Sequence, residues 1–489
     1  MPPPTIDRRR FLKGAGIGGL AVVIGPTLWQ QASAAAAPVV EQVHLQFGTD
    51  AARQVSVSWA TAGSVSKPRV RYGTAKGGLG STVAAVTQTY ADPLTKRVVT
   101  THHVRLEGLH PSTDYVYEAL HQGAAPVMGT FRTGPAGRAP FRFTSFGDQG
   151  VNGLPLGSVA SNTVVDHIEA AKPLLHLVNG DLAYSDLQTN PAGAWDAWFN
   201  QNQRSTQFRP WMAAAGNHEQ LTGNGPIGYD AYLTRYANPP NGVSGLAGYF
   251  YAFTVGAVRF VVLQNDDVAY QWATDSYVRG YSGGAQKRWL TTTLESAHAD
   301  PAIDWIVVSM HEIAMSSSIN GNGSDLGVRQ EWLPLFDRYE VDLVLGGHDH
   351  DYERSYTVRG VEPGSSTLSP QVVDTATKTI DVTKGAVHLV LGGGGSVPTD
   401  TYEPSTPPPA SKVIVGKTSR FVSVYDYELP TWSAVRDPAE AYGFGVFDVV
   451  PSAPGGKTQI RAGYYQTASL PGGPPVLYDT FTLEKPRTT

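Results

Sequence analysis

The sequence predicts an all-β sandwich followed by a larger α/β domain. From Val43 to about Pro135, apolar and polar residues alternate in short runs broken by turn residues, which is typical of strands with one buried face. After residue 136, apolar runs of strand type alternate with segments of helical spacing, which indicates strand–helix–strand units. The 53 Gly and 35 Pro among 489 residues favour a turn-rich chain over a helical bundle. We expect the sandwich over residues 38–136 and the α/β domain, with its C-terminal strands, over residues 137–489.

The predicted sandwich carries alternating strands and a recognisable corner. Residues 55–59 place every second side chain on one face, and residues 129–133 would form the last strand. Residues 109–117 are similar to the strand entry of a fibronectin type III sandwich, in which a tyrosine hydroxyl ties back a corner. Three histidines lack acidic neighbours and are expected at the surface rather than in a metal site: His102, His103 and His110.

The α/β domain is predicted from its apolar runs. We expect strands over residues 141–146, 174–178, 303–308, 341–345, 445–449 and 478–483, and a further strand within 384–395. Helices are expected over residues 158–171 and 328–340, and a proline-rich loop over 396–411.

The first 37 residues resemble a bacterial twin-arginine export signal. Three arginines at residues 8–10 precede a Gly- and Ala-rich stretch that carries no charge before Glu41. Small residues fill positions 32–37, and we expect cleavage somewhere after Ala34. Repeated glycines and Pro26 interrupt the apolar stretch, so a retained membrane helix is not expected. The mature protein should therefore be secreted without a membrane anchor.

Composition excludes several classes of function. With Lys+Arg 37, Asp+Glu 42 and a net charge of −5, the chain has no basic excess to hold a nucleic acid by its phosphates. It contains no Cys, which excludes disulfides, cysteine-ligated zinc, iron–sulfur clusters and thiol nucleophiles. Any metal would have oxygen and nitrogen ligands.

Five polar motifs follow predicted strands. They are Gly147-Asp148-Gln149-Gly150, Gly180-Asp181-Leu182-Ala183-Tyr184, Gly216-Asn217-His218-Glu219, Val308-Ser309-Met310-His311 and Gly347-His348-Asp349-His350. The carboxyl ends of strands linked by crossover helices share one edge of a sheet, so we expect these motifs to meet there. Carboxylates, imidazoles, an amide oxygen and a phenol suit iron, manganese and zinc.

The order and content of these motifs resemble the purple acid phosphatases, a family of binuclear metallophosphoesterases. The similarity is strongest from Arg329 to Ser355, and it includes the sandwich. The resemblance implies a four-layer α/β/β/α sandwich for the second domain. It implies that a ferric ion is held by Asp148, Asp181, Tyr184 and His350, and a divalent zinc, manganese or iron ion by Asn217, His311 and His348, with Asp181 bridging the two.

The implied function is that of a secreted acid phosphatase. It would hydrolyse small phosphate monoesters by in-line attack of a metal-bound hydroxide, which the net positive charge of the centre makes available near neutral pH. His218 matches no ligand of the family pattern. By resemblance, His218 and Asn217 contact the substrate phosphate, and His218 is the catalytic residue that assists the leaving group. The alternative for His218 is a histidine that orients metal ligands.

The chain departs from the family after His311. Plant-type members carry further histidines there, whereas residues 312–322 contain none. Ser and Asn can bind a phosphate oxygen but cannot protonate an alkoxide near neutral pH, which leaves His218 or Glu312 as general acid. The segment 312–325 is either a substrate-facing loop or a mobile surface loop.

Two other functions stay open. One is a phosphodiesterase, or a broader phosphoric ester hydrolase, on the same metal centre. The other is an exported binding protein whose sandwich holds a polymer and whose metal domain is inert. Comparing rates on a monoester and a diester separates the first from a phosphomonoesterase, and binding without hydrolysis identifies the second.

Overall fold

The computed structural model describes residues 37–271, 278–397, 410–418, 422–437, 442–467 and 473–487. The export signal expected over residues 1–37 lies outside these residues apart from Ala37, and so does most of the loop expected over 396–411. Within the described ranges, no helix is both long enough and apolar enough to cross a membrane.

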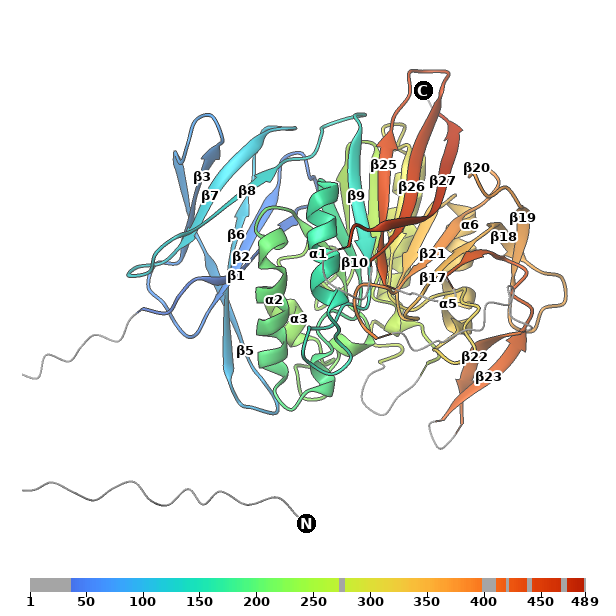
Figure 1. The fold of residues 1–489 in the computed structure, drawn as a ribbon, viewed down its shortest axis with the longest axis horizontal. Helices are drawn as coiled ribbons and strands as arrows, with labels where there is room; N and C mark the ends of the chain where they lie inside the picture. The colour runs from blue at the N-terminus through green and yellow to red at the C-terminus, as the bar shows by residue number, and fades with distance from the viewer. Residues whose placement is uncertain are drawn as a thin grey trace, which may run out of the picture. The chain divides into compact units, whose positions relative to one another are not determined.

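The sandwich consists of two four-stranded antiparallel sheets (Figure 1). One has the order β1 (Glu41–Phe47), β2 (Val55–Thr61), β6 (Val98–Leu106), β5 (Val86–Ala91). The other has the order β4 (Ser81–Ala84), β3 (Arg69–Thr74), β7 (Asp114–Leu120), β8 (Val127–Arg132). The expected corner is present, because the His110 N–H donates to the Tyr115 hydroxyl at 2.9 Å.

The histidines of the sandwich do not all lie at its surface. His110 is exposed, but His102 and His103 are 1% and 8% exposed, so their predicted surface position was wrong. His102 is buried inside the sandwich, where its ring contacts Trp59. His103, on the other face of β6, points to the α/β domain, and its Nε2–H donates to the Thr234 carbonyl in α3 (Asp230–Arg235) at 2.9 Å. The alternation of β6 did not reveal this second buried face.

The α/β domain is built on two seven-stranded sheets. The first has the order β11 (Trp211–Ala214), β10 (Leu175–Asn179), β9 (Phe141–Phe146), β25 (Gly443–Val450), β26 (Lys457–Gln466), β27 (Val476–Pro486), β20 (Thr379–Asp381). The second has the order β12 (Tyr251–Val255), β13 (Val258–Val262), β14 (Trp305–Ser309), β16 (Leu343–Gly346), β21 (Val387–Leu391), β17 (Tyr352–Ser355), β24 (Ser433–Arg436). Two smaller sheets contain β15 (Ser324–Asp325), β22 (Ser411–Lys417) and β23 (Ser423–Glu428), and β18 (Thr357–Val361) and β19 (Pro370–Asp374).

Alternation along the strands makes four layers of these sheets and their helices. Phe143 of β9 and Val307 of β14 lie in one core between the two sheets. Phe146, on the other face of β9, packs with α1 (Ala160–Ala171) and α2 (Pro191–Thr206). Val308 packs with the helices of the second sheet, which are α4 (Ala285–Ala299), α5 (Leu326–Glu331) and α6 (Leu333–Arg338). The predicted α/β/β/α architecture is thereby confirmed.

The single helix expected over residues 328–340 is two short helices. α5 ends at Glu331 and α6 starts at Leu333. Pro334 stands in the first turn of α6, where it has no N–H to offer a carbonyl of α5. The buried Trp332 joins the two helices and packs in the core below the second sheet.

The sandwich and the α/β domain share one hydrophobic core. Leu45 and Phe47 of β1 belong to the same buried cluster as Met212 of β11. The backbone of Val43 is also tied to α2, since its N–H donates to a side-chain oxygen of Gln203 at 3.0 Å. The sandwich is thus packed directly onto the domain that carries the motifs.

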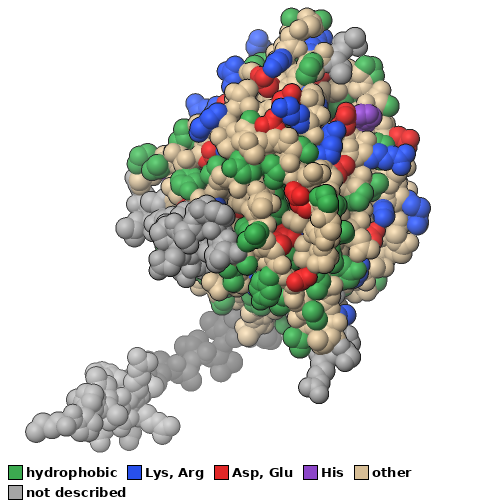
Figure 2. Space-filling model, turned by 90° about the vertical axis from the view of Figure 1, so that its right-hand side faces the viewer, with side chains coloured by type: hydrophobic (Ala, Val, Ile, Leu, Met, Phe, Trp, Pro, Cys, Tyr) green, Lys and Arg blue, Asp and Glu red, His purple; other side chains and the backbone are tan. Residues whose placement is uncertain are grey.

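Charges are mixed at the surface. On the face in Figure 2, Lys and Arg side chains are interspersed with Asp and Glu side chains rather than gathered into one basic patch. This agrees with the net charge of −5.

Candidate metal centre

The predicted ligands come from two sheets rather than one. Asp148, Asp181 and Asn217 follow β9, β10 and β11, which are parallel neighbours in the first sheet. His311 and His348 follow β14 and β16, which are parallel neighbours in the second sheet. The expectation of a single sheet edge was therefore wrong, and the packing of the two sheets brings two edges together.

Asn179 at the end of β10 joins the two edges. Its carbonyl accepts the Nδ1–H of His311 at 2.7 Å, and its Oδ1 atom accepts the Ser309 hydroxyl at 2.8 Å. A second tie runs from the backbone N–H of His348 to Oδ2 of Asp148 at 2.8 Å. The two halves of the cluster are therefore held together by hydrogen bonds from ligand residues and their neighbours.

One side of the cluster is rich in oxygen. The Tyr184 hydroxyl lies 3.3 Å from Oδ1 of Asp148 and 2.9 Å from Nε2 of His350. The His350 Nε2 atom lies 3.5 Å from the same Asp148 oxygen. A carboxylate, a phenol and an imidazole thus converge on one point, as the sequence motifs predict.

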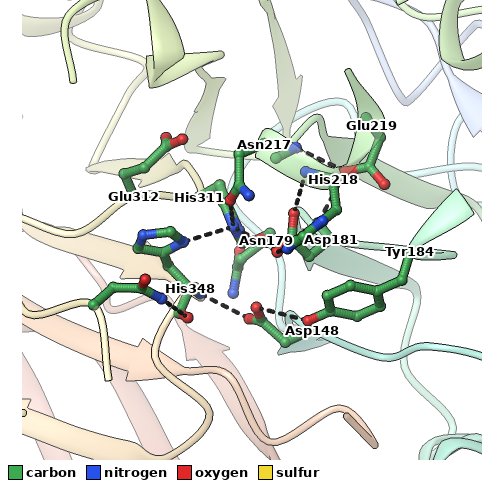
Figure 3. Close-up of polar contacts among 12 residues, drawn as sticks. Asp148, Asn179, Asp181, Tyr184, Asn217, His218, Glu219, His311, Glu312 and His348 are labelled. Carbon is green, nitrogen blue, oxygen red and sulfur yellow. Dashed lines mark hydrogen bonds and ion pairs between the residues drawn. The ribbon is translucent and has the colours of Figure 1, made fainter. Parts of the chain in front are cut away.

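The other side combines imidazoles with an amide. Nε2 of His311 lies 3.1 Å from Oδ2 of Asp181, 3.1 Å from Oδ1 of Asn217 and 3.1 Å from Nδ1 of His348. The ligand atoms of Asp181, His311 and His348 lie close enough together to hold one metal ion. Figure 3 shows Asp181 between this group and Tyr184.

In His311 and His350, a hydrogen bond at Nδ1, the ring nitrogen that faces away from the cluster, leaves the lone pair of Nε2 directed into the cluster. Nδ1 of His350 lies 2.7 Å from the Val397 carbonyl, and His311 is held in the same way by Asn179. Since a carbonyl only accepts, these nitrogens carry the protons, and Nε2 of each neutral ring is unprotonated. Unprotonated nitrogens that converge with carboxylates form a donor set for a metal ion.

Burying the carboxylates of this cluster without a cation beside them costs free energy. Asp148 and Asp181 are 0% and 2% exposed, and among the described residues neither forms an ion pair with a lysine or arginine. Burial raises the pKa of Asp148, and burial with the charges of Asp148 and Asp181 raises the pKa of Tyr184 well above 10. A bound cation would offset both effects, so the residues fit the binuclear centre that the motifs imply.

The backbone supports the ligands in an uncommon conformation. Asp148, Asp181, Tyr184 and His348 have φ values of 59°, 51°, 48° and 73°, in the left-handed region. Such strain persists only where the surroundings fix it, and it is typical of functional sites. A Cβ at Gly347 would lie 2.3 Å from Oδ2 of Asp148, which explains why this motif contains glycine.

His218 stands at the rim of the cluster. Its side chain is 22% exposed, and its Nδ1 atom lies 2.8 Å from Oδ2 of Asp186. Its ring packs on that of Tyr184, with 4.7 Å between ring centres, and its backbone N–H donates to Asp181 at 3.0 Å. His218 thus lies beside the ligands and reaches solvent.

Glu219 is a functional residue that sequence reasoning missed. Its carboxylate accepts the backbone N–H groups of Gly216 at 2.8 Å, Asp181 at 2.9 Å and Leu182 at 2.9 Å. It is 1% exposed and ties the β10 loop to the β11 loop. Its place directly after Asn217 and His218 in the third motif was the available signal.

The segment 312–325 is packed rather than loose. Most of it is buried, and Asp349 accepts the N–H groups of Asn322 at 2.5 Å and Gly323 at 3.0 Å. The segment is therefore not a surface loop. Glu312 is fully buried against Asp266, and burial with the charge of Asp266 raises its pKa well above the ordinary value.

Comparisons with known proteins agree with this site. A family model described as Purple acid Phosphatase, N-terminal domain, matches residues 40–133, and one described as Calcineurin-like phosphoesterase matches residues 157–352. An uncharacterized protein of Mycobacterium tuberculosis (strain H37Rv) is 47% identical over 518 residues, covering 99% of this chain and 97% of its own. The Fe(3+)-Zn(2+) purple acid phosphatase 12 of Arabidopsis thaliana is 25% identical over 369 residues, covering 73% and 72%.

A solved structure shares the fold. The purple acid phosphatase PPD1 from yellow lupin seeds superposes with a TM-score of 0.67 at 19% identity, covering 92% of this chain and 75% of that one. The layered sheets and the buried cluster define a phosphoesterase of the calcineurin-like class. More narrowly, the chain belongs to the purple acid phosphatase family, as the sequence motifs predict.

Proposed function

We propose that the protein is an exported acid phosphatase that hydrolyses small phosphate monoesters at a binuclear centre of one ferric and one divalent ion. The observation that carries this proposal is the contact of the Tyr184 phenol with Asp148 and His350 inside a buried donor set. A buried phenol stays protonated unless a strongly charged cation binds it, which favours a trivalent ion on that side. The name of the Arabidopsis relative, an Fe(3+)-Zn(2+) enzyme, supports the same pairing.

The ligands divide between the two ions. In this proposal Asp148, Tyr184, His350 and Asp181 would hold the ferric ion. Asn217, His311, His348 and Asp181 would hold the divalent zinc, manganese or iron ion. When bound, the two ions supply Lewis acidity toward phosphate and an activated water for in-line attack.

The chain itself orients the ester and assists its leaving group. Asn217 inside the cluster and His218 at its rim would bind phosphate oxygens. Asp186 accepts from Nδ1 of His218 and so fixes the ring with Nε2 directed away from that carboxylate. His218 in its protonated form holds a proton at Nε2 for the leaving oxygen. Glu312 is the weaker candidate for this role, because its carboxyl lies against Asp266 in the interior.

Export through a twin-arginine system belongs to the same proposal. It rests on the arginines at residues 8–10 and the small residues at 32–37. Replacing the arginine pair with lysines should retain the protein in the cytoplasm, and cell fractionation measures this.

The decisive test compares kcat/KM for a phosphate monoester and for a matched bis-ester of the same alcohol. A higher value for the monoester supports the proposal, and a higher value for the bis-ester identifies a phosphodiesterase on the same centre. Metal-loaded protein that binds cell-wall polymer but hydrolyses neither ester would instead be an exported binding protein.

A further inference from the structure

The three histidines of the centre are not held alike. The rear nitrogens of His311 and His350 lie against backbone carbonyls, those of Asn179 and Val397. The rear nitrogen of His348, Nε2, instead lies 2.5 Å from the side-chain oxygen Oε1 of Gln271. Among these three ligands, His348 alone is oriented by a side chain, and so by a group that substitution can change.

A closed ring of hydrogen bonds fixes the proton on His348. The backbone carbonyl of His348 can only accept, so Asn322 must present its Nδ2 group there, at 2.8 Å. Oδ1 of Asn322 then faces Nε2 of Gln271 at 2.7 Å and accepts from it. Oε1 of Gln271 is left as the acceptor for the Nε2–H of His348. The neutral ring then has its unprotonated Nδ1 beside Nε2 of His311, at 3.1 Å.

Asp325 anchors Gln271 in this ring. Its Oδ2 atom accepts the backbone N–H groups of Tyr270 at 2.8 Å and Gln271 at 3.0 Å, and its Oδ1 atom caps α5 through the N–H of Gly327 at 2.7 Å. Asp325 is 1% exposed, so this anchor is shielded from water. The backbone of Gln271 is therefore held by the residue that caps the start of α5.

We propose that Gln271 is a positioning residue that sets the tautomer of His348 and thereby the affinity of the divalent-metal side of the centre. Gln271 makes no hydrogen bond, among those described, to Asp148, Tyr184 or His350. Partners behind metal-bound histidines are worth about 10- to 100-fold in metal affinity. This inference rests on the metal centre of the proposed function and not on its substrate.

The test uses the full metal-loaded chain and the variant Gln271→Leu, which keeps the bulk but removes both hydrogen bonds. The divalent-ion affinity, measured by competition with a chelator, should fall about 10- to 100-fold. The metal on the Tyr184 side and its visible absorption should remain. Gln271→Glu, which keeps an acceptor for the Nε2–H of His348, should restore the affinity to within a few-fold. The matched control is Gln330→Leu, a substitution at an exposed residue whose side-chain oxygen accepts from the Tyr270 hydroxyl and contacts none of the predicted metal ligands among the described residues.

Each other outcome contradicts the inference. Unchanged affinity in Gln271→Leu, or equal losses of both metals, would overturn it, as would a Gln271→Glu variant as weak as Gln271→Leu. If Gln271→Leu does not fold, the Gln271→Glu variant tests the inference instead. Its divalent-ion affinity must then stay near that of the parent chain. A parent chain that binds two metals but cleaves no phosphoester would refute the proposed function and leave this test intact.

Discussion

Nε2 of His311 lies 3.1 Å from Nδ1 of His348, and when both rings are neutral neither nitrogen has a proton to give the other. Each ring already donates from its opposite nitrogen, His311 to Asn179 and His348 to Gln271. Two lone pairs at this separation repel each other unless a cation lies within reach of both, and that cation is either a metal ion or a proton on His311. Although burial lowers the pKa of His311, the charges of Asp181 and Asp148 raise it to about 10, so the site favours a bound cation.

Metal removal should therefore destabilise the whole protein. Dialysis against a chelator is expected to lower the melting temperature, because a ligand at a thousandfold excess over its Kd stabilises the folded state by about 4 kcal/mol. Differential scanning calorimetry before and after adding back iron and zinc measures the effect. An unchanged melting temperature would mean that the cluster is satisfied without metal.

The Tyr184→Phe variant should lose visible absorption. A phenolate bound to a ferric ion gives a broad charge-transfer band, and phenylalanine has no oxygen to supply it. The visible spectrum and the metal content should be recorded together on parent and variant. Tyr229→Phe is a matched control, because Tyr229 is also buried but its hydroxyl contacts Asp266 rather than a predicted ligand. A colourless, active parent with two divalent ions would remove iron from the assignment.

The Glu219→Gln variant should loosen both loops that it joins. An amide presents one acceptor and one donor to Gly216, Asp181 and Leu182, so at least one buried N–H loses its partner. We expect a loss of about 1–3 kcal/mol in the free energy of unfolding, and weaker metal binding through Asp181. Denaturant unfolding and metal analysis measure these two effects. Glu107→Gln, at an exposed position, is the control, and equal behaviour of the two variants would contradict this role.

Local sequence patterns predicted which ligand residues follow the strands, but not how these residues are arranged in space. Asp148 and His348 could be found because each follows an apolar run and stands beside glycine. Asn179, Gln271 and Glu219 act through contacts between segments far apart in sequence, and no spacing rule encodes such contacts. The packing of two sheets was likewise not visible in local patterns, because each sheet on its own gives the same alternation of strands and helices, and it was expected only from the family resemblance.

The side-chain pattern also failed to predict burial where one domain covers the surface of another. His103 reads as the polar side of a strand, and it became buried only because β6 packs on α3. The break between α5 and α6 could have been predicted, since Pro334 is visible in the sequence.

The Asp186→Asn variant should impair turnover without removing metal. Asp186 contacts Nδ1 of His218 at 2.8 Å, and an amide there no longer supplies the charge that favours a protonated ring. We expect kcat to fall about 10- to 100-fold, which is less than the full rate contribution of a positioned general acid, because His218 itself is still present. His218→Asn should cost as much or more, and the double variant little beyond that, because the two residues act as one unit. Fully additive losses would assign them separate roles.

Acid should weaken the join between the sandwich and α3 through His103. Both ring nitrogens of neutral His103 have a hydrogen-bond partner. Its Nε2–H donates to the Thr234 carbonyl at 2.9 Å, and its Nδ1 lies 2.8 Å from the Ser58 hydroxyl. Burial, with the nearby His44, His102 and Arg105, lowers the pKa of His103 from 6.5 to about 4.

Between pH 6.5 and 4, His103 is therefore protonated in the unfolded chain but remains neutral in the folded chain. The free energy of unfolding falls as the pH falls through that window. The shift corresponds to at most about 3 kcal/mol at pH 4. Denaturant unfolding at several pH values should show a shallower slope for His103→Gln than for the parent chain, whatever its absolute stability. The exposed His110→Gln should keep the parent slope. A parent slope retained in His103→Gln would place the acid sensitivity in other groups.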